Sequence, residues 1–480
     1  MDIFGKLKTE RVEGVGKTAE SILLFPVQHP TMTALMLGGI FTLITYPGIW
    51  YSDSYVRAMI ASQISGGVDY SEISTFLSLL PQLFISWGLK LTGNFAFYTW
   101  VQASFFLGTL IYVIRFFFSD YKSIQAVVLL LFLCCPLVFG YSVYWETGVV
   151  TATALVLLVA ISEKQCREKT MPQGIMWIIL GGCFVCVGYR INAATAIFAV
   201  LLIEIWDAIH GRKPIHRVLL AGSAIILGTL MAISLPRLLK TKNNSNVVVG
   251  IVWETSCMLN RIGEGHGYDT YVDDLLGDGI TSAIMAVENV PEESMYTFES
   301  ITGYGHIAED GWLTGQYFRK YFHLIFEKPR TFLRMKLEMA KRTLGELPFI
   351  EYDYNRWDQM SEFQYSDSQR RHDFYDTVVK FMENWHWGRT PWKVFLTSFI
   401  LFGICVLGKA NGIVAGKLIF VALFYEMAFL VTTQSHEFRY FFPALFLLII
   451  AITIEIFEIS KRAAQIFKAR LQQETIHDLR

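Results

Sequence analysis

Long apolar runs separated by polar connections dominate this sequence. A helix that crosses a bilayer needs roughly 20 mainly apolar residues, and ten runs approach or reach that length. They lie near 31–50, 95–117, 123–140, 143–161, 174–189, 191–209, 218–237, 394–408, 414–433 and 440–459. Because helices satisfy all their backbone hydrogen bonds internally, this pattern predicts an all-α polytopic membrane protein with about 10 transmembrane helices.

The basic residues predict how these helices are oriented. Lys and Arg gather in the N-terminal stretch, in 163–169, in 212–217, near 409–417 and in the tail from 461. Basic connections stay on the cytoplasmic side. Ten spans with both termini inside satisfy that rule for every one of these connections, which predicts a multi-pass protein of the plasma membrane.

A further apolar stretch, 74–92, breaks this agreement if it is counted as a span, because all later basic connections would then lie outside. We therefore expect it to form a helix on the outer membrane surface. The predicted organisation has four parts. They are 1–239, a transmembrane module with a first extracytoplasmic loop at 51–94; 240–390, an extracytoplasmic domain; 391–460, the C-terminal transmembrane helices; and 461–480, a cytoplasmic tail.

Composition narrows the classes of function. Hydrophobic residues make up 53% of the chain and charged residues 17%, as is typical of a polytopic membrane protein. The net charge of −1 argues against nucleic acid as a partner. The polar region 240–390 has mostly helical periodicity, so the predicted outer domain is mainly helical.

Polar clusters occur in four short connections that the predicted topology places at the outer membrane boundary. Ionisable groups at that depth are candidates for function, because they must face a shared cavity or one another. The clusters contain Asp53 with Arg57, then Glu146, then Arg190, and finally His436 with Arg439 and Tyr440.

Their chemistry suits a substrate that carries phosphate. A carboxylate can act as a general base, and a second one can orient an acceptor or share a divalent cation. Guanidinium groups bind phosphate in two-pronged geometry. Each residue also has a structural reading: Arg57 can pair with Asp53, Arg190 can pair with Glu146, and Arg439 can anchor the last span.

Two segments resemble bacterial GT-C membrane glycosyltransferases of surface-polysaccharide decoration. They are YPGIWYSD at 46–53 and HEFRYFFP at 436–443. The resemblance implies a GT-C fold and transfer of a sugar from a polyprenyl-phosphate donor to a surface glycan, cell-wall polymer or lipid-linked acceptor. It implies Asp53 as the base and Glu146 as the second acid.

The same resemblance implies substrate contacts for five further residues, with Arg190 and Arg439 holding the donor phosphate. The five are Arg57, Arg190, His436, Arg439 and Tyr440. A divalent cation, Mg²⁺ or Mn²⁺, could bind between Asp53 and Glu146. Many relatives carry paired acids in the first loop, whereas here Ser54 follows Asp53, which leaves metal dependence open.

Two rival functions remain at this point. One is a polysaccharide polymerase or ligase that uses polyprenyl-diphosphate glycans, although such proteins depend more on Arg and His than on an acid after the first helix. The other is a non-enzymatic glycolipid transporter or flippase. The spans are poor in charge and carry no evident repeat, which argues against transport.

Overall fold

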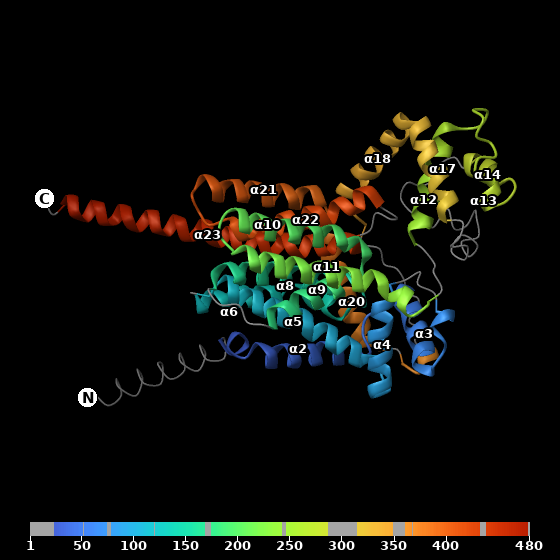
Figure 1. Ribbon diagram of the computed structural model, residues 1–480. Helices are drawn as coiled ribbons and strands as arrows, with labels where there is room; N and C mark the ends of the chain where they lie inside the picture. The colour runs from blue at the N-terminus through green and yellow to red at the C-terminus, as the bar shows by residue number, and fades with distance from the viewer. Residues whose placement is uncertain are drawn as a thin grey trace.

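A computed structural model describes most of the chain, and Figure 1 shows that it is built from helices. The described residues are 24–50, 52–73, 78–119, 121–168, 174–241, 246–286, 314–348, 361–366, 368–432 and 438–478. Among them the one β pairing is an isolated parallel bridge between Ile49 and Tyr144. The predicted all-α class is confirmed over these ranges.

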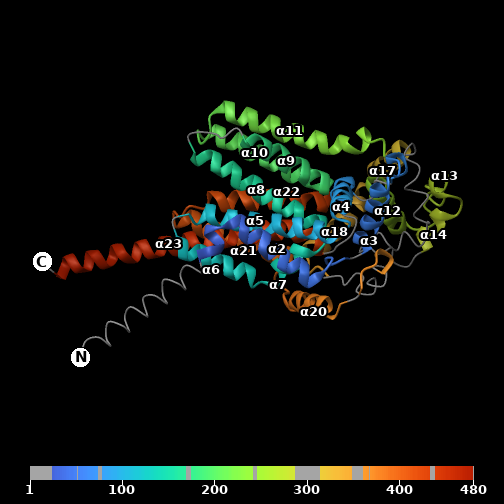
Figure 2. The same ribbon diagram turned by 90° about the horizontal axis from the view of Figure 1, so that it is seen from below.

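Most of the helices run side by side in one bundle (Figures 1 and 2). Its central member is α8, whose side chains are almost all buried and which packs against α5, α9, α10, α22 and α23. The bundle helices are α2 (Pro30–Thr45), α5 (Ala96–Phe117), α8 (Thr147–Arg167), α9 (Gly174–Tyr189), α10 (Ala194–Ile209), α11 (Ile215–Leu238), α21 (Pro391–Leu407), α22 (Ile413–Thr432) and α23 (Phe438–Asp478).

Several of these helices are suited to a membrane. Within the described ranges, five helical segments are long and apolar enough to cross one, and a bent pair could provide a sixth. The five are Ala96–Phe117, Thr147–Arg167, Ile191–Ile209, Ile215–Leu238 and Phe438–Gln473. Helices α2, α9 and α21 are apolar but shorter. The chain is therefore a membrane protein, and the count of ten spans stays a prediction.

The apolar run at 123–140 differs from its expected form. It is divided into α6 (Lys122–Leu133) and α7 (Pro136–Val143), whose axes differ by 67°. Pro136 lacks a backbone N–H, and the residue before a proline is disfavoured in helical geometry. Cys135 is accordingly extended, with ψ of 118°. The run expected to form one span is therefore two helices with a sharp bend between them.

The apolar stretch after the first loop forms α4 (Leu79–Thr92). Figure 1 shows that α4 lies across the end of the bundle beside α3 (Ser52–Gly66). One face, which includes Leu80 and Leu83, is buried against neighbouring helices, while Trp87 is 52% and Leu91 is 76% exposed. Its orientation agrees with the expected surface helix, although its position relative to a membrane stays a prediction.

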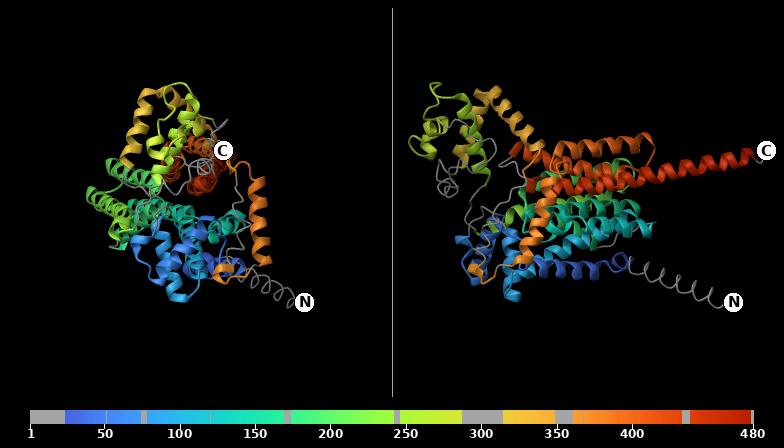
Figure 3. Two further views of the ribbon diagram at one scale, coloured as in Figure 1. Left: turned by 90° about the vertical axis from the view of Figure 1, so that its right-hand side faces the viewer. Right: turned by 180° about the vertical axis from the view of Figure 1, so that it is seen from behind.

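A separate group of helices lies beyond the same end of the bundle (Figure 3). It has a small apolar core of its own, which includes Trp253, Leu324, Met335 and Met339. The members are α12 (Asn246–Ile262), α13 (Asp273–Leu276), α14 (Ile280–Ala286), α17 (Thr314–Glu327) and α18 (Pro329–Leu344). The later helix α20 (Gln369–Asn384) does not join them but packs against α7 and α2 (Figure 2). Part of the predicted 240–390 domain thus packs against the side of the bundle.

The opposite end of the bundle holds a buried network of ion pairs. Lys417 Nζ lies 3.1 Å from Glu163 Oε2 and 2.7 Å from Asp207 Oδ2. Arg212 contacts the same two carboxylates at 2.9 and 3.0 Å. Residues of the connections 163–169 and 212–217 therefore meet Lys417 at one end of the bundle, and the polar clusters lie at the other.

Candidate functional site

Two connections between bundle helices are joined by the isolated bridge. Ile49 N donates to Val143 O at 3.1 Å, and Trp145 N donates to Ile49 O at 3.1 Å. Gly48 allows this approach: its φ is 141°, and a Cβ at this position would lie 2.6 Å from Thr99 Oγ1. A side chain there would clash, so glycine sets the distance between the loop that leads to Asp53 and the loop that carries Glu146.

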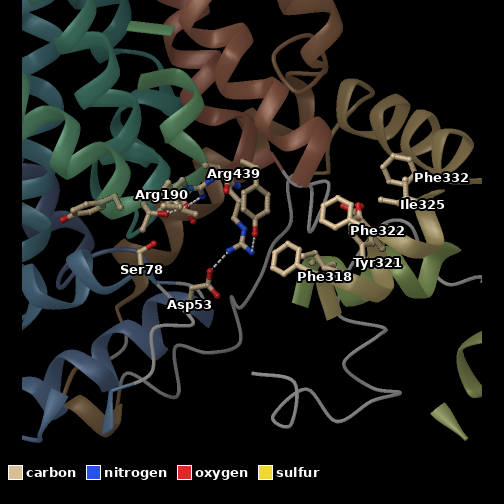
Figure 4. A pocket seen from close by; sticks show the side chains of 18 of the residues that line it. Asp53, Ser78, Arg190, Phe318, Tyr321, Phe322, Ile325, Phe332 and Arg439 are labelled. Atoms are coloured by element: carbon tan, nitrogen blue, oxygen red, sulfur yellow. Dashed lines mark hydrogen bonds and ion pairs between the residues drawn. The ribbon is translucent and has the colours of Figure 1, made fainter. Parts of the chain in front are cut away.

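A cavity of about 590 Å³ opens between this end of the bundle and helices α12, α17 and α18 (Figure 4). It brings together six of the seven site residues predicted from the sequence. They are Asp53, Arg57, Glu146, Arg190, Arg439 and Tyr440. The seventh, His436, lies outside the described residues.

Asp53 lies in the first turn of α3 and faces Arg439. Its Oδ2 accepts a hydrogen bond from Arg439 Nη1 at 3.0 Å, shown as a dashed line in Figure 4. Arg57 Nη2 lies 3.8 Å from the same oxygen, and Arg57 Nη1 donates to Trp145 O at 3.1 Å. The Asp53 side chain is 26% exposed, whereas that of Arg439 is 10% exposed. The acid is therefore accessible from the cavity and faces two guanidinium groups.

Glu146 and Arg190 form a second, more deeply buried pair. Glu146 is the N-cap of α8, where its Oε1 accepts from Gly148 N at 3.2 Å. Arg190 Nη2 contacts the same oxygen, and Arg190 Nε donates to Thr147 Oγ1 at 2.9 Å. Arg190 Nη1 also reaches the hydroxyl of Tyr425 at 3.4 Å. All three nitrogens of this guanidinium thus contact the protein itself.

Tyr440 connects the two ion pairs. Its ring centroid lies 4.9 Å from Arg190 Cζ and 5.0 Å from Arg439 Cζ. Arg439 Nη2 also donates to the Tyr440 hydroxyl at 3.2 Å. Because a guanidinium over an aromatic face is attracted by the ring, Tyr440 holds both arginines at the cavity wall. The sequence had assigned it only a substrate contact.

Comparison with known proteins found no match, so a function must be inferred from the residues of the cavity. No protein-family model matches the chain, and no curated protein or solved structure matches it significantly. A fold of packed apolar helices hosts many activities, so the chemistry of the cavity carries the argument.

Both carboxylates that were expected to share a divalent cation are paired with arginines. Asp53 Oδ2 and Glu146 Oε1 each contact an arginine, so a cation bound by both carboxylates would lie beside two guanidinium groups. In the described part of the chain, no group of three or more His, Cys, Asp or Glu is placed to hold a metal. Mg²⁺ or Mn²⁺ at these carboxylates stays a prediction.

The far wall of the cavity was not predicted from the sequence. Phe318, Phe322 and Ile325 of α17 line it, together with Glu254 of α12 and Tyr321. The helical spacing of apolar residues in α17 was visible, but it indicates only that one face is covered. Which surface that face meets depends on tertiary packing over long sequence separations.

Proposed function

We propose that the protein is a membrane glycosyltransferase that moves a sugar from a polyprenyl-phosphate donor to a surface glycan or cell-wall polymer on the outer face of the plasma membrane. The observation that most supports this proposal is the Asp53–Arg439 ion pair, which lies in a cavity at the end of an apolar helix bundle. A lipid-linked donor has its phosphate at headgroup depth and its chain in the bilayer. At that depth the buried guanidinium of Arg439 suits the donor phosphate, and the accessible carboxylate of Asp53 suits the acceptor hydroxyl.

Arg439 is the better of the two candidates for the donor phosphate. Both of its terminal nitrogens face the cavity side of the pair, one on Asp53 and one on Tyr440. Arg190 is instead committed to Glu146, Thr147 and Tyr425. In the proposed mechanism Arg190 and Glu146 are positioning residues that hold Tyr440, and through it Arg439.

The transfer step follows from these positions. The donor phosphate binds Arg439 in competition with Asp53, which makes Asp53 Oδ2 available to the acceptor hydroxyl. The acceptor oxygen attacks the anomeric carbon, the bond from that carbon to the phosphate oxygen breaks, and the bonding electrons stay on the phosphate. Asp53 takes the acceptor proton. The guanidinium stabilises the charge that develops on the leaving phosphate.

One observation favours a second candidate function. Three guanidinium groups line the cavity, from Arg57, Arg190 and Arg439, and this amount of positive charge would also suit the diphosphate of a polymerase or ligase donor. Both reactions must remove a proton from an acceptor hydroxyl. The acid directly after the first apolar helix favours the monophosphate reaction, because polymerases and ligases depend more on Arg and His. A transporter catalyses neither reaction and would not need a base at this position.

The test is donor specificity in a purified system. The wild-type protein in detergent is given a radiolabelled polyprenyl-phosphate hexose or an undecaprenyl-diphosphate glycan, with envelope polysaccharide from cells that lack the protein as acceptor. We expect label to move to the polysaccharide only from the monophosphate donors. Transfer from the diphosphate donor alone would establish the polymerase or ligase instead. For the protein reconstituted in vesicles, movement of donor across the membrane without transfer would establish a flippase.

A further inference from the structure

A third carboxylate lies on the far wall of the cavity. Glu254 of α12 is 4% exposed and lines the cavity opposite Asp53. Its Oε2 accepts from the Tyr321 hydroxyl at 2.6 Å, and its Oε1 accepts from Lys336 Nζ at 2.5 Å. The cluster therefore joins α12, α17 and α18 at one point. Figure 4 shows Tyr321 across the cavity from Asp53 and Arg439.

The three helices are also joined by apolar packing beside this charged cluster. The neighbouring core consists of apolar residues, among them Trp253, Met335 and Met339. Burying a carboxylate and an ammonium group costs desolvation energy that their attraction often fails to offset. Burial raises the pKa of Glu254 although Lys336 opposes the shift. Such a group in a cavity wall is a candidate for ligand binding.

Aromatic rings lie beside the cluster. Phe318 and Phe322 are one turn apart on α17, with nearly parallel rings whose centroids are 6.2 Å apart. Phe322 is 48% exposed and also lines the cavity. A flat aromatic surface packs well on the C–H face of a sugar ring, while a carboxylate and a phenol hydroxyl bond to sugar hydroxyls. The wall offers both kinds of contact side by side.

An isoprenoid chain would fit this wall poorly. It would cover the phenylalanines but would offer no hydrogen-bonding group to Glu254 and Tyr321, which line the same cavity. The wall also belongs to α12, α17 and α18, which lie beyond the end of the apolar bundle (Figure 3). A saccharide offers hydroxyls to these polar side chains and C–H faces to the rings, whereas a lipid chain offers only apolar contacts.

We propose that Glu254, Tyr321, Phe318 and Phe322 form a subsite for the saccharide acceptor. This inference rests on the proposed transfer reaction and assigns its two substrates to opposite walls: the donor phosphate binds Arg439 at the bundle, and the acceptor binds the α12–α17 wall. An acceptor held there presents a hydroxyl toward Asp53. Glu254 is thus a specificity-determining residue rather than a catalytic one.

Direct binding tests this assignment independently of transfer. Fluorescently labelled envelope polysaccharide, purified from cells that lack the protein, is titrated with the full-length protein in detergent, and undecaprenyl phosphate is titrated separately. We expect Glu254→Gln to weaken polysaccharide binding by about tenfold or more, since a hydrogen bond to a charged group is lost. Undecaprenyl phosphate binding should not change. Phe322→Ser, at an exposed position that does not threaten folding, should weaken polysaccharide binding several-fold.

The matched control is Asp274→Asn. Asp274 forms an exposed ion pair with Lys320 in the same group of helices, outside the cavity, so both titrations should match those of the wild type. Normal polysaccharide binding by both Glu254→Gln and Phe322→Ser would overturn the subsite, as would a wild-type protein that binds no polysaccharide. Weaker binding of undecaprenyl phosphate instead would overturn the assignment to the acceptor. If Glu254-dependent polysaccharide binding is found but no sugar is transferred, the subsite stands and the proposed transfer fails.

Discussion

The buried pair of Glu146 and Arg190 gives a prediction that separates support from phosphate binding. Arg190→Met removes the guanidinium and leaves the Glu146 carboxylate, which is 1% exposed, without its charged partner. Breaking a buried ion pair from one side typically costs about 3–5 kcal/mol. The Gly148 N–H still donates to Glu146, so we place the loss near the lower end, at about 3 kcal/mol.

The double variant Glu146→Gln/Arg190→Met removes both charges. The new amide oxygen can still accept from Gly148 N, so the N-cap of α8 is kept. Replacing both members of a buried pair is often neutral or even stabilising. We therefore expect the double variant to recover most of the stability that Arg190→Met loses, while sugar transfer stays impaired because Tyr440 has lost one of its two cations.

The assay is thermal unfolding in detergent, followed by tryptophan fluorescence at one fixed scan rate because such unfolding is often irreversible. The expected order of melting temperature is wild type, then double variant, then Arg190→Met. If Arg190→Met melts with the wild type, or the double variant is no more stable than Arg190→Met, the pair is not a structural support and the positioning role of Arg190 is wrong.

Three further predictions follow. Arg439→Lys should weaken use of the donor partially and Arg439→Ala severely, since lysine keeps the charge but loses the two-pronged guanidinium geometry. The KM for the polyprenyl-phosphate donor at saturating acceptor measures this effect. Normal donor kinetics in both variants would mean that Arg439 only anchors the last span. Because burial raises the pKa of Glu254, its protonation stabilises the fold fully below the unfolded value of about 4.3, and that stability is lost as pH rises through the folded value. The melting temperature of wild type minus that of Glu254→Gln should therefore fall over this range, and a constant difference would contradict the burial argument. Cysteine labelling should reach 240–390 from outside, and 163–169 and 212–217 only after permeabilisation; the reverse would move the whole site to the cytoplasmic face.

The sequence could predict which connections meet. Connections between apolar helices alternate between the two ends, so Glu146, Arg190 and Arg439 were expected to share an end with Asp53. The connections 163–169 and 212–217 were expected to share the other. The structure confirms both groupings. That inference needed only helix lengths and the distribution of Lys and Arg.

The partners within each cluster could not be predicted in the same way. Local spacing favours Arg57 as the partner of Asp53, because the two lie one helical turn apart. The shorter contact belongs to Arg439, which is 386 residues away in the chain. The Glu254 wall was missed for the same reason: α17 shows an amphipathic pattern in the sequence, but only the packing of three helices places its aromatic face against the site. Such contacts depend on the tertiary fold rather than on local pattern.

The most direct test of the central claim is sugar transfer by purified Asp53→Asn. General-base catalysis usually supplies 10²–10⁴-fold in rate, and the amide keeps the shape of the side chain but cannot take the proton. We expect turnover with a polyprenyl-phosphate sugar to fall by about that factor, while Glu72→Gln, a change of an exposed acid in the same loop, keeps wild-type turnover. Wild-type turnover by Asp53→Asn would contradict the proposed role of Asp53 and, with it, the assignment of the cavity as a glycosyl-transfer site.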